Sequence, residues 1–125
     1  MSMSFGDDLV VDPETMRGRD WPCLRQFGVF LENRVGRLNE LLMHLERSDL
    51  RVCALSISDT IDCVIVRLIM SNYERALELL KLSGFTFFES DIIGVELPDD
   101  DQPFARLCQA LLQAEVNIHY SYPLL

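Results

Sequence analysis

The sequence predicts an α+β fold with the element order β-α-β-β-α-β, followed by a partial second β-α-β repeat. Three observations support it: the apolar period switches between those of strand and helix, a polar turn separates two strand segments, and the first part of the pattern recurs. The chain has 125 residues, of which 49% are hydrophobic and 25% charged. This composition is ordinary for a globular protein, so it excludes disorder, collagen and a coiled coil for the whole chain.

Residues 1–22 are predicted to form an acidic N-terminal tail with a short strand at residues 9–11. The tail contains Pro13 and Pro22 and has no helical period. It also lacks the basic start and apolar run of a signal peptide. No apolar stretch in the chain approaches the roughly 20 residues that a membrane helix needs. We therefore expect a cytoplasmic protein without a membrane partner.

The first half of the complete unit is a strand, a helix and a hairpin. Alternating apolar residues predict the strand: Phe27, Val29 and Leu31. The next apolar residues have the i, i+3, i+4, i+7 spacing of an amphipathic helix: Leu38, Leu41, Leu42 and Leu45. Two aliphatic strands at 52–57 and 63–70 are joined by polar residues typical of a hairpin connection.

The second half of the unit is a helix and a strand. Ser71 and Glu74 have the spacing of a capping box, which predicts a helix start. The residues predicted to face inward are Tyr73, Ala76, Leu77 and Leu80. Gly84 can adopt the left-handed conformation that ends a helix, and residues 85–89 then return to extended structure.

The first part of this pattern recurs at a constant offset of 66 residues, the separation of Gly28 and Gly94. At this offset the apolar strand residues of the first unit correspond to Ile93, Val95 and Leu97. The apolar helix residues correspond to Phe104, Leu107, Cys108 and Leu111. A following strand is predicted at 118–122. The pattern indicates a complete unit at 23–90 and a partial second repeat at 91–125.

The second repeat stops at Leu125, which matches Asp59 at the start of the hairpin connection in the first unit. The strand that should lie beside residues 118–122 is therefore absent, and this would leave an unpaired row of backbone groups. Two explanations are open: the natural chain is longer, or a partner chain supplies the missing edge.

The charge balance limits the possible partners. The chain has 20 acidic and 11 basic residues, a net charge of −9, and no lysine or arginine cluster. Nucleic acid and anionic membrane surfaces would be repelled, whereas small zwitterions and other proteins are compatible. The four cysteines form no CxxC pair, so we expect reduced and mostly buried thiols.

Several segments resemble the ACT domain family, the small ligand-sensing modules of amino-acid metabolism. Residues 30–38, FLENRVGRL, resemble its strand-loop-helix signature. Residues 54–60, ALSISDT, with 66–69, VRLI, are similar to tandem-ACT amino-acid-binding proteins related to the acetolactate synthase regulatory subunit. Residues 117–122, NIHYSY, resemble the second-repeat strand of the same proteins.

The resemblance implies a ferredoxin-like βαββαβ domain with an antiparallel sheet, acting in allosteric regulation and not as an enzyme. It implies an amino-acid ligand in the loop between the first strand and first helix, at an interface between ACT units. It also implies a homodimer through sheet edges or helices, with a metabolic enzyme as a further partner.

The predicted ligand-binding residues are those of this loop: Asn33, Arg34, Val35, Gly36, Arg37 and Leu38. Unpaired amides at the helix N-terminus suit a carboxylate, and Gly36 lets a ligand approach the backbone. Asn33 offers a donor and an acceptor, and either arginine adds positive charge. Asn33 and Gly36 also suit any tight strand-to-helix loop, and the arginines also suit a solvated surface.

The corresponding loop of the second repeat, residues 99–104, departs from this pattern because Gln102 stands where Gly36 stands in the first. Pro103 and an aspartate N-cap explain the loop as a helix start. Its three consecutive aspartates would repel a carboxylate, and they lack the alternating spacing of a calcium loop. We predict no metal site and no cofactor.

Three further residues have a predicted structural role. Arg67 lies in an aliphatic strand, and we expect it to pair with Asp59 or Asp62 across the hairpin. Tyr120 and Tyr122 share one face of the last predicted strand, where aromatic packing or an interface is expected and the wall of a pocket is the alternative.

No catalytic constellation is found. His44, predicted on the polar side of the first helix, and His119 have no motif-spaced nucleophile or acid. The leading hypothesis is an amino-acid-sensing regulatory module. The alternative, motivated by Gln102 and the incomplete repeat, is a protein-interaction or assembly module that keeps the ACT fold without ligand sensing.

Overall fold

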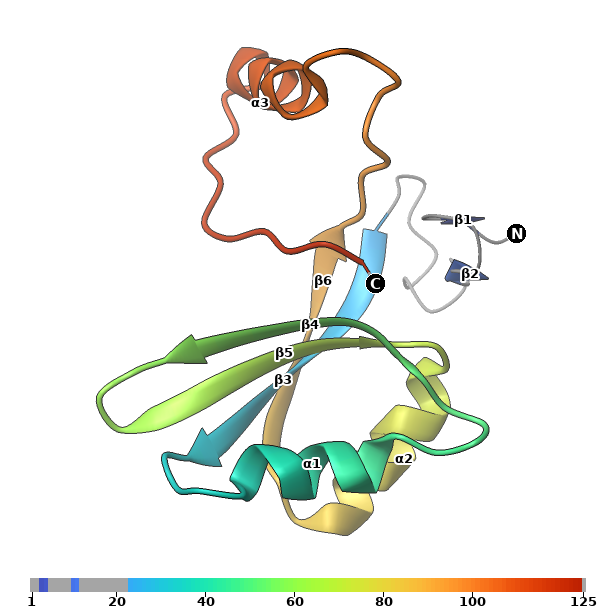
Figure 1. The fold of residues 1–125 in the computed structure, drawn as a ribbon, viewed down its shortest axis with the longest axis vertical. Helices are drawn as coiled ribbons and strands as arrows, with labels where there is room; N and C mark the ends of the chain where they lie inside the picture. Colours follow the sequence, from blue (N-terminus) through green and yellow to red (C-terminus); the bar gives the residue numbers. More distant parts are fainter. Residues whose placement is uncertain (1–2, 5–9, 12–22, 125) are drawn as a thin grey trace.

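The computed structural model describes residues 3–4, 10–11 and 23–124 (Figure 1). Strands β1 (Met3–Ser4) and β2 (Val10–Val11) pair antiparallel in a small separate sheet. Strand β2 falls inside the strand predicted at 9–11. The rest of the predicted N-terminal tail lies outside the described residues.

The main sheet has four strands: β3 (Cys23–Glu32), β4 (Val52–Asp59), β5 (Cys63–Met70) and β6 (Thr86–Ile93). Their spatial order is β4-β5-β3-β6, and all neighbours are antiparallel. Helices α1 (Arg37–Leu45) and α2 (Tyr73–Ser83) lie together below the sheet in Figure 1. The order β3-α1-β4-β5-α2-β6 confirms the predicted α+β, ferredoxin-like fold.

The core lies between the sheet and these two helices. Because side chains alternate along a strand, the odd-numbered residues Phe27, Val29 and Leu31 of β3 all face the helices and are buried. Leu41 of α1 and Leu80 of α2 are completely buried against them. Each fully buried side chain of this kind contributes about 1.5–3 kcal/mol to folding, and the larger of the two clusters of buried residues lies on this face.

Helix α2 begins differently from the prediction. The capping box of Ser71 and Glu74 is wrong, because Asn72 is the N-cap and its side chain accepts a hydrogen bond from the Arg75 amide at 3.1 Å. The Ser71 amide instead donates to the Arg51 carbonyl at 2.9 Å. Ser71 therefore still belongs to the pairing of the preceding strands, and the helix can only start after it.

The end and the packed face of α2 are closer to the prediction. Gly84 ends the helix with φ 78°, which confirms the predicted left-handed cap. Ala76 and Leu80 face inward as predicted, whereas Tyr73 and Leu77 are half-buried. Leu79, which the predicted stripe omits, is also buried.

The second repeat forms only its helix, α3 (Pro103–Gln113), in place of a full β-α-β unit. The strands predicted at 93–97 and 118–122 are absent, because β6 ends at Ile93 and no strand occurs in the described residues beyond it. No residue of α3 is buried, and Phe104 and Leu112 are 69% and 75% exposed. A strand needs a hydrogen-bonded neighbour, and neither residues 94–97 nor residues 118–122 pair with a strand of the described part of the chain.

Residues 116–124, which we name the C-terminal strap, return from α3 to the sheet face opposite α1 and α2 (Figure 1). We name this face the outer face. Tyr122 and Leu124 of the strap pack there against a second cluster of buried residues: Leu24, Cys53, Ala54 and Ile69. The turn before the strap contains Glu115 with φ 57°, a left-handed conformation that is uncommon outside glycine.

Candidate functional site

The predicted loop between β3 and α1 is largely open to solvent. Residues 33–36 are exposed, and Val35 is 100% exposed. Arg34 makes a surface ion pair with Glu32 at 3.6 Å. Gly36 has φ 90° and is the N-cap of α1 without a side-chain hydrogen bond, so this loop requires glycine for backbone geometry.

Arg37 and Leu38 differ from the other predicted residues because they turn toward the body of the protein. Leu38 packs against the core. The Arg37 guanidinium lies 4.8 Å from the Phe85 ring centroid, and its Nη1 donates to Glu40 at 2.6 Å. Its Nε is buried and has no hydrogen-bond partner.

A groove of about 320 Å³ lies beside Arg37. Its polar lining comes from four parts of the chain: Glu32, Arg37, Asp62, Cys63 and Thr86. Of the six predicted ligand-binding residues, only Arg37 lines this groove. The structure therefore brings one predicted residue together with two carboxylates that the prediction did not include, Glu32 and Asp62.

A second polar cluster, which the sequence analysis did not predict, lies on the outer face. Gln26 of β3 is completely buried there. Its Nε2 donates to Ser90 Oγ at 2.9 Å and to the Tyr120 hydroxyl at 2.5 Å, and its Oε1 accepts from the Tyr122 hydroxyl at 2.6 Å. The rings of Tyr120 and Tyr122 stack with their centroids 6.4 Å apart, which confirms the predicted aromatic packing. The strand predicted for these two residues does not form, since they lie in the strap.

Arg67 belongs to this outer-face cluster. The predicted ion pair with Asp59 or Asp62 is wrong: Nη1 donates to Ser58 Oγ at 3.0 Å, and the guanidinium lies 4.2 Å from the Tyr120 ring centroid. The register explains the difference, since Arg67 pairs with Ser56 of β4. Ser58, two residues along, shares this face of the sheet, whereas Asp59 points to the other.

Burial of the strap affects the ionisation of Tyr122. Desolvation raises the pKa of the Tyr122 phenol well above its usual range, and Tyr120 adds to the rise while Arg67 opposes it. The folded state therefore favours the neutral phenol. The stabilisation that this provides is complete below the unfolded-state pKa of about 10 and is lost as the pH rises above it.

Tyr122→Phe is accordingly expected to reduce the loss of stability at alkaline pH. Circular dichroism melts between about pH 8 and 11 should show the Tm of the parent falling more steeply above about pH 10 than that of the variant. Equal slopes for the two proteins would show that Tyr122 titrates as it does in the unfolded chain.

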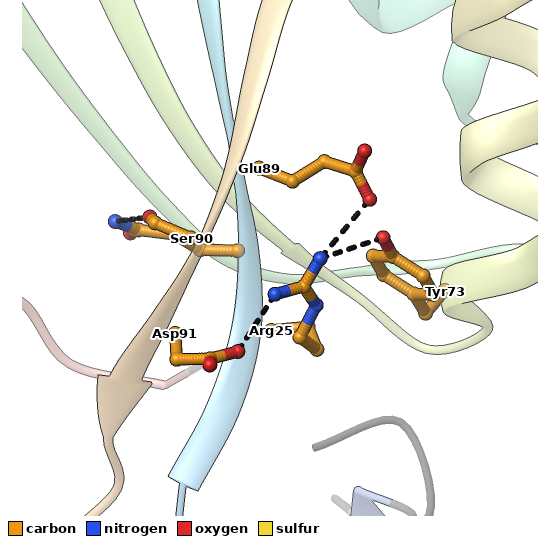
Figure 2. A network of polar contacts seen from close by, with 6 residues as sticks. Arg25, Tyr73, Glu89, Ser90 and Asp91 are labelled. Atoms are coloured by element: carbon orange, nitrogen blue, oxygen red, sulfur yellow. Dashed lines mark hydrogen bonds and ion pairs between the residues drawn. The ribbon is translucent and has the colours of Figure 1, made fainter. Parts of the chain in front are cut away.

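A third polar cluster lies on the helix side of the sheet (Figure 2). The Arg25 side chain is 3% exposed, with Nη1 2.8 Å from Asp91 and Nη2 3.2 Å from Glu89. Nη2 also donates to the Tyr73 hydroxyl at 3.0 Å. Because strand β3 pairs Arg25 directly with Asp91, the cluster ties β3 to β6 and has a structural role.

The histidine and cysteine side chains offer little reactive chemistry. His44 is not on a solvated side of α1, because its Nε2 lies 3.0 Å from the Leu79 carbonyl oxygen of α2. Cys53, Cys63 and Cys108 are free thiols, as predicted. The expectation that they are mostly buried is wrong for these three, because only Cys53 is buried and Cys108 is exposed. Burial raises the pKa of the Cys53 thiol, which disfavours its reactive thiolate form.

The described residues contain no group of three or more His, Cys, Asp and Glu side chains arranged to hold a metal ion. Over the same part of the chain, none of the helices is both long and apolar enough to cross a membrane.

Comparison with known proteins gives two matches. A family model described as an ACT domain pair matches residues 23–125. The crystal structure of a protein from Bacteroides thetaiotaomicron is similar, with a TM-score of 0.72 and 30% sequence identity over 79% of this chain and 69% of that chain. No curated protein matches.

Proposed function

The chain belongs to the ACT domain family, and on this premise we propose that it is a regulatory module that binds an amino acid or a similar small zwitterion. A regulatory, small-molecule-binding role is general for ACT domains. The proposal assigns no catalytic activity to the chain. The ligand site is the groove at the start of α1, and the ligand acts by favouring one arrangement of paired ACT units.

The observation that carries this proposal is the unpartnered Nε of Arg37 beside the groove. A buried donor without a partner is costly and calls for an explanation, such as a ligand that completes it. A carboxylate accepting from Nε would form a charge-assisted hydrogen bond. Glu32 and Asp62 line the same groove and can neutralise an ammonium group, so the groove has both charges that a zwitterion needs.

The proposal includes a homodimer. Strands β4 and β6 are the edges of the sheet, and an edge strand offers unpaired backbone groups to a second copy. A metabolic enzyme, in the cytoplasm, is the proposed target of the regulation. With a net charge of −9, neither nucleic acid nor an anionic membrane fits as a partner.

Arg37→Gln is expected to weaken amino-acid binding by about tenfold or more, because it removes a charged donor worth roughly 1.5–3 kcal/mol. Isothermal titration calorimetry with a panel of the common amino acids measures this effect. Arg34→Gln is the matched control, since Arg34 lies in the same loop and is exposed. The proposal fails if no amino acid binds below millimolar concentration, or if both variants lose the same affinity.

The alternative function, assembly without ligand sensing, is favoured by one observation. Helix α3 buries none of its residues, so its apolar stripe is available to another protein. The same calorimetry separates the two functions, because an assembly module would bind no amino acid in any variant.

A further inference from the structure

Arg67 combines two features: its Nε is buried without a hydrogen-bond partner, and it makes no ion pair with a carboxylate in the described part of the chain. Among the described side chains, two buried nitrogen or oxygen atoms have no hydrogen-bond partner: Nε of Arg37 and Nε of Arg67. Five other arginines make ion pairs with carboxylates: Arg25, Arg34, Arg37, Arg75 and Arg106. In the described part of the chain no carboxylate pairs with Arg67, although acidic residues outnumber basic ones 20 to 11.

The surroundings of Arg67 fix the guanidinium and leave one edge of it unused. Ser58 accepts from Nη1, and the Tyr120 ring covers one face. Gln26 in turn holds the hydroxyls of Tyr120 and Tyr122. The remaining edge carries the Nε and Nη2 donors, and this pair of donors matches the two oxygens of a carboxylate.

The apolar surface next to Arg67 indicates what else a ligand would contact. Arg67 pairs across the sheet with Gly28, and a Cβ on Gly28 would lie 2.1 Å from Phe88 Cζ, so the Phe88 ring lies directly over this glycine. Phe30 packs beside Phe88 with centroids 5.4 Å apart. Both rings are 36% exposed, so they can receive an apolar group.

We propose that the outer face holds a binding site for a small apolar carboxylic acid, whose carboxylate pairs with Arg67 and whose apolar body lies on Phe30 and Phe88. A monoanion fits better than phosphate, because the single guanidinium of Arg67 is the charge that faces it. This site shares Phe30 with the lining of the groove at Arg37, but its charged group is Arg67, which does not line that groove. Its existence does not require the groove to bind an amino acid.

The C-terminal strap acts as the lid of this site. Nε of Arg67 is buried, and Tyr120 of the strap lies 4.2 Å from the guanidinium. In this proposal a carboxylate reaches Nε when the strap shifts. Two phenol hydrogen bonds to Gln26 and the packing of Tyr122 and Leu124 hold the strap closed. Ligand binding and strap closure are therefore in competition, and a weaker strap should give tighter binding.

The test is an NMR titration of the full chain with phenylacetate, followed through the side-chain Nε–H signal of Arg67 and the side-chain amide of Gln26. We expect saturable shifts of both signals. Phenylacetamide, which has the same ring without the charge, should leave the Arg67 signal unchanged. Tyr122→Phe should lower the Kd severalfold, since it removes one hydrogen bond of the lid.

Arg67→Gln should abolish the response of Gln26, whereas Arg51→Gln, which removes the same charge from an exposed position, should not. Melting curves check that both variants fold. The proposal is overturned if the Arg67 signal does not saturate with phenylacetate, or if phenylacetamide shifts that signal as much as phenylacetate does. It is also overturned if inorganic phosphate shifts the signal and phenylacetate does not. Calorimetry on Arg37→Gln measures amino-acid binding at the groove, and the NMR titration measures phenylacetate binding at Arg67. Failure of one proposal is therefore distinguishable from failure of the other.

Discussion

Arg25→Met is expected to lower the free energy of unfolding by about 3 kcal/mol, because removing one partner of a buried ion pair leaves the other uncompensated. Methionine keeps much of the apolar stem but removes the charge and the donors. Glu89 and Asp91 then lose their shared cation, and Tyr73 loses its donor. Since Glu89 and Asp91 share one face of β6, their mutual repulsion also becomes uncompensated (Figure 2).

Urea denaturation followed by circular dichroism measures this change. Neutralising the two acids in the same protein, with Glu89→Gln and Asp91→Asn, should recover most of the lost stability, since no buried charge is then left alone. Arg34→Met is the control at an exposed ion pair, where the expected loss is less than about 1 kcal/mol. Equal losses for Arg25→Met and Arg34→Met would contradict a structural role for the buried network.

The sequence was sufficient for the elements that depend on local pattern. The strand of Phe27, Val29 and Leu31 and the helix of Leu41 and Leu45 follow from apolar periods, and these residues are the buried ones in the structure. The clusters around Arg25 and Gln26 could not be predicted in the same way. Their partners are 48 to 96 residues away, and only the pairing of β3 with β6, the packing of α2 and the path of the strap bring them together.

The candidate ligand site was predicted only in part, because some of its residues come from distant parts of the chain. The loop signature located Arg37 at the start of α1, where its side chain reaches the groove. The acids that complete the groove for a zwitterion are Glu32, at the end of β3, and Asp62, in the turn before β5. The sequence predicts Asp62 as a hairpin residue and a partner of Arg67, because it does not reveal which face of the sheet the Arg67 side chain occupies.

The second repeat shows where a periodic pattern stops being informative. Its apolar stripe predicts a helix, and α3 forms, but the same pattern cannot supply the neighbours that its strands and helix would pack against. In the first repeat, Leu41 is completely buried beneath the sheet. Its counterpart 66 residues later, Leu107, is only half-buried. The two leucines are therefore a matched pair, with the same position in the repeat and different packing.

Leu41→Ala is expected to lower the free energy of unfolding by about 2–5 kcal/mol, because it removes buried methyl groups and leaves a cavity in the core. Leu107→Ala should cost less than about 1 kcal/mol, since no residue of α3 is buried and Leu107 belongs to neither cluster of buried residues. Urea denaturation of dilute protein measures both. A loss for Leu107→Ala that grows with protein concentration would mean that α3 is packed in the folded state against a second copy, and the stability of the second repeat would then depend on association.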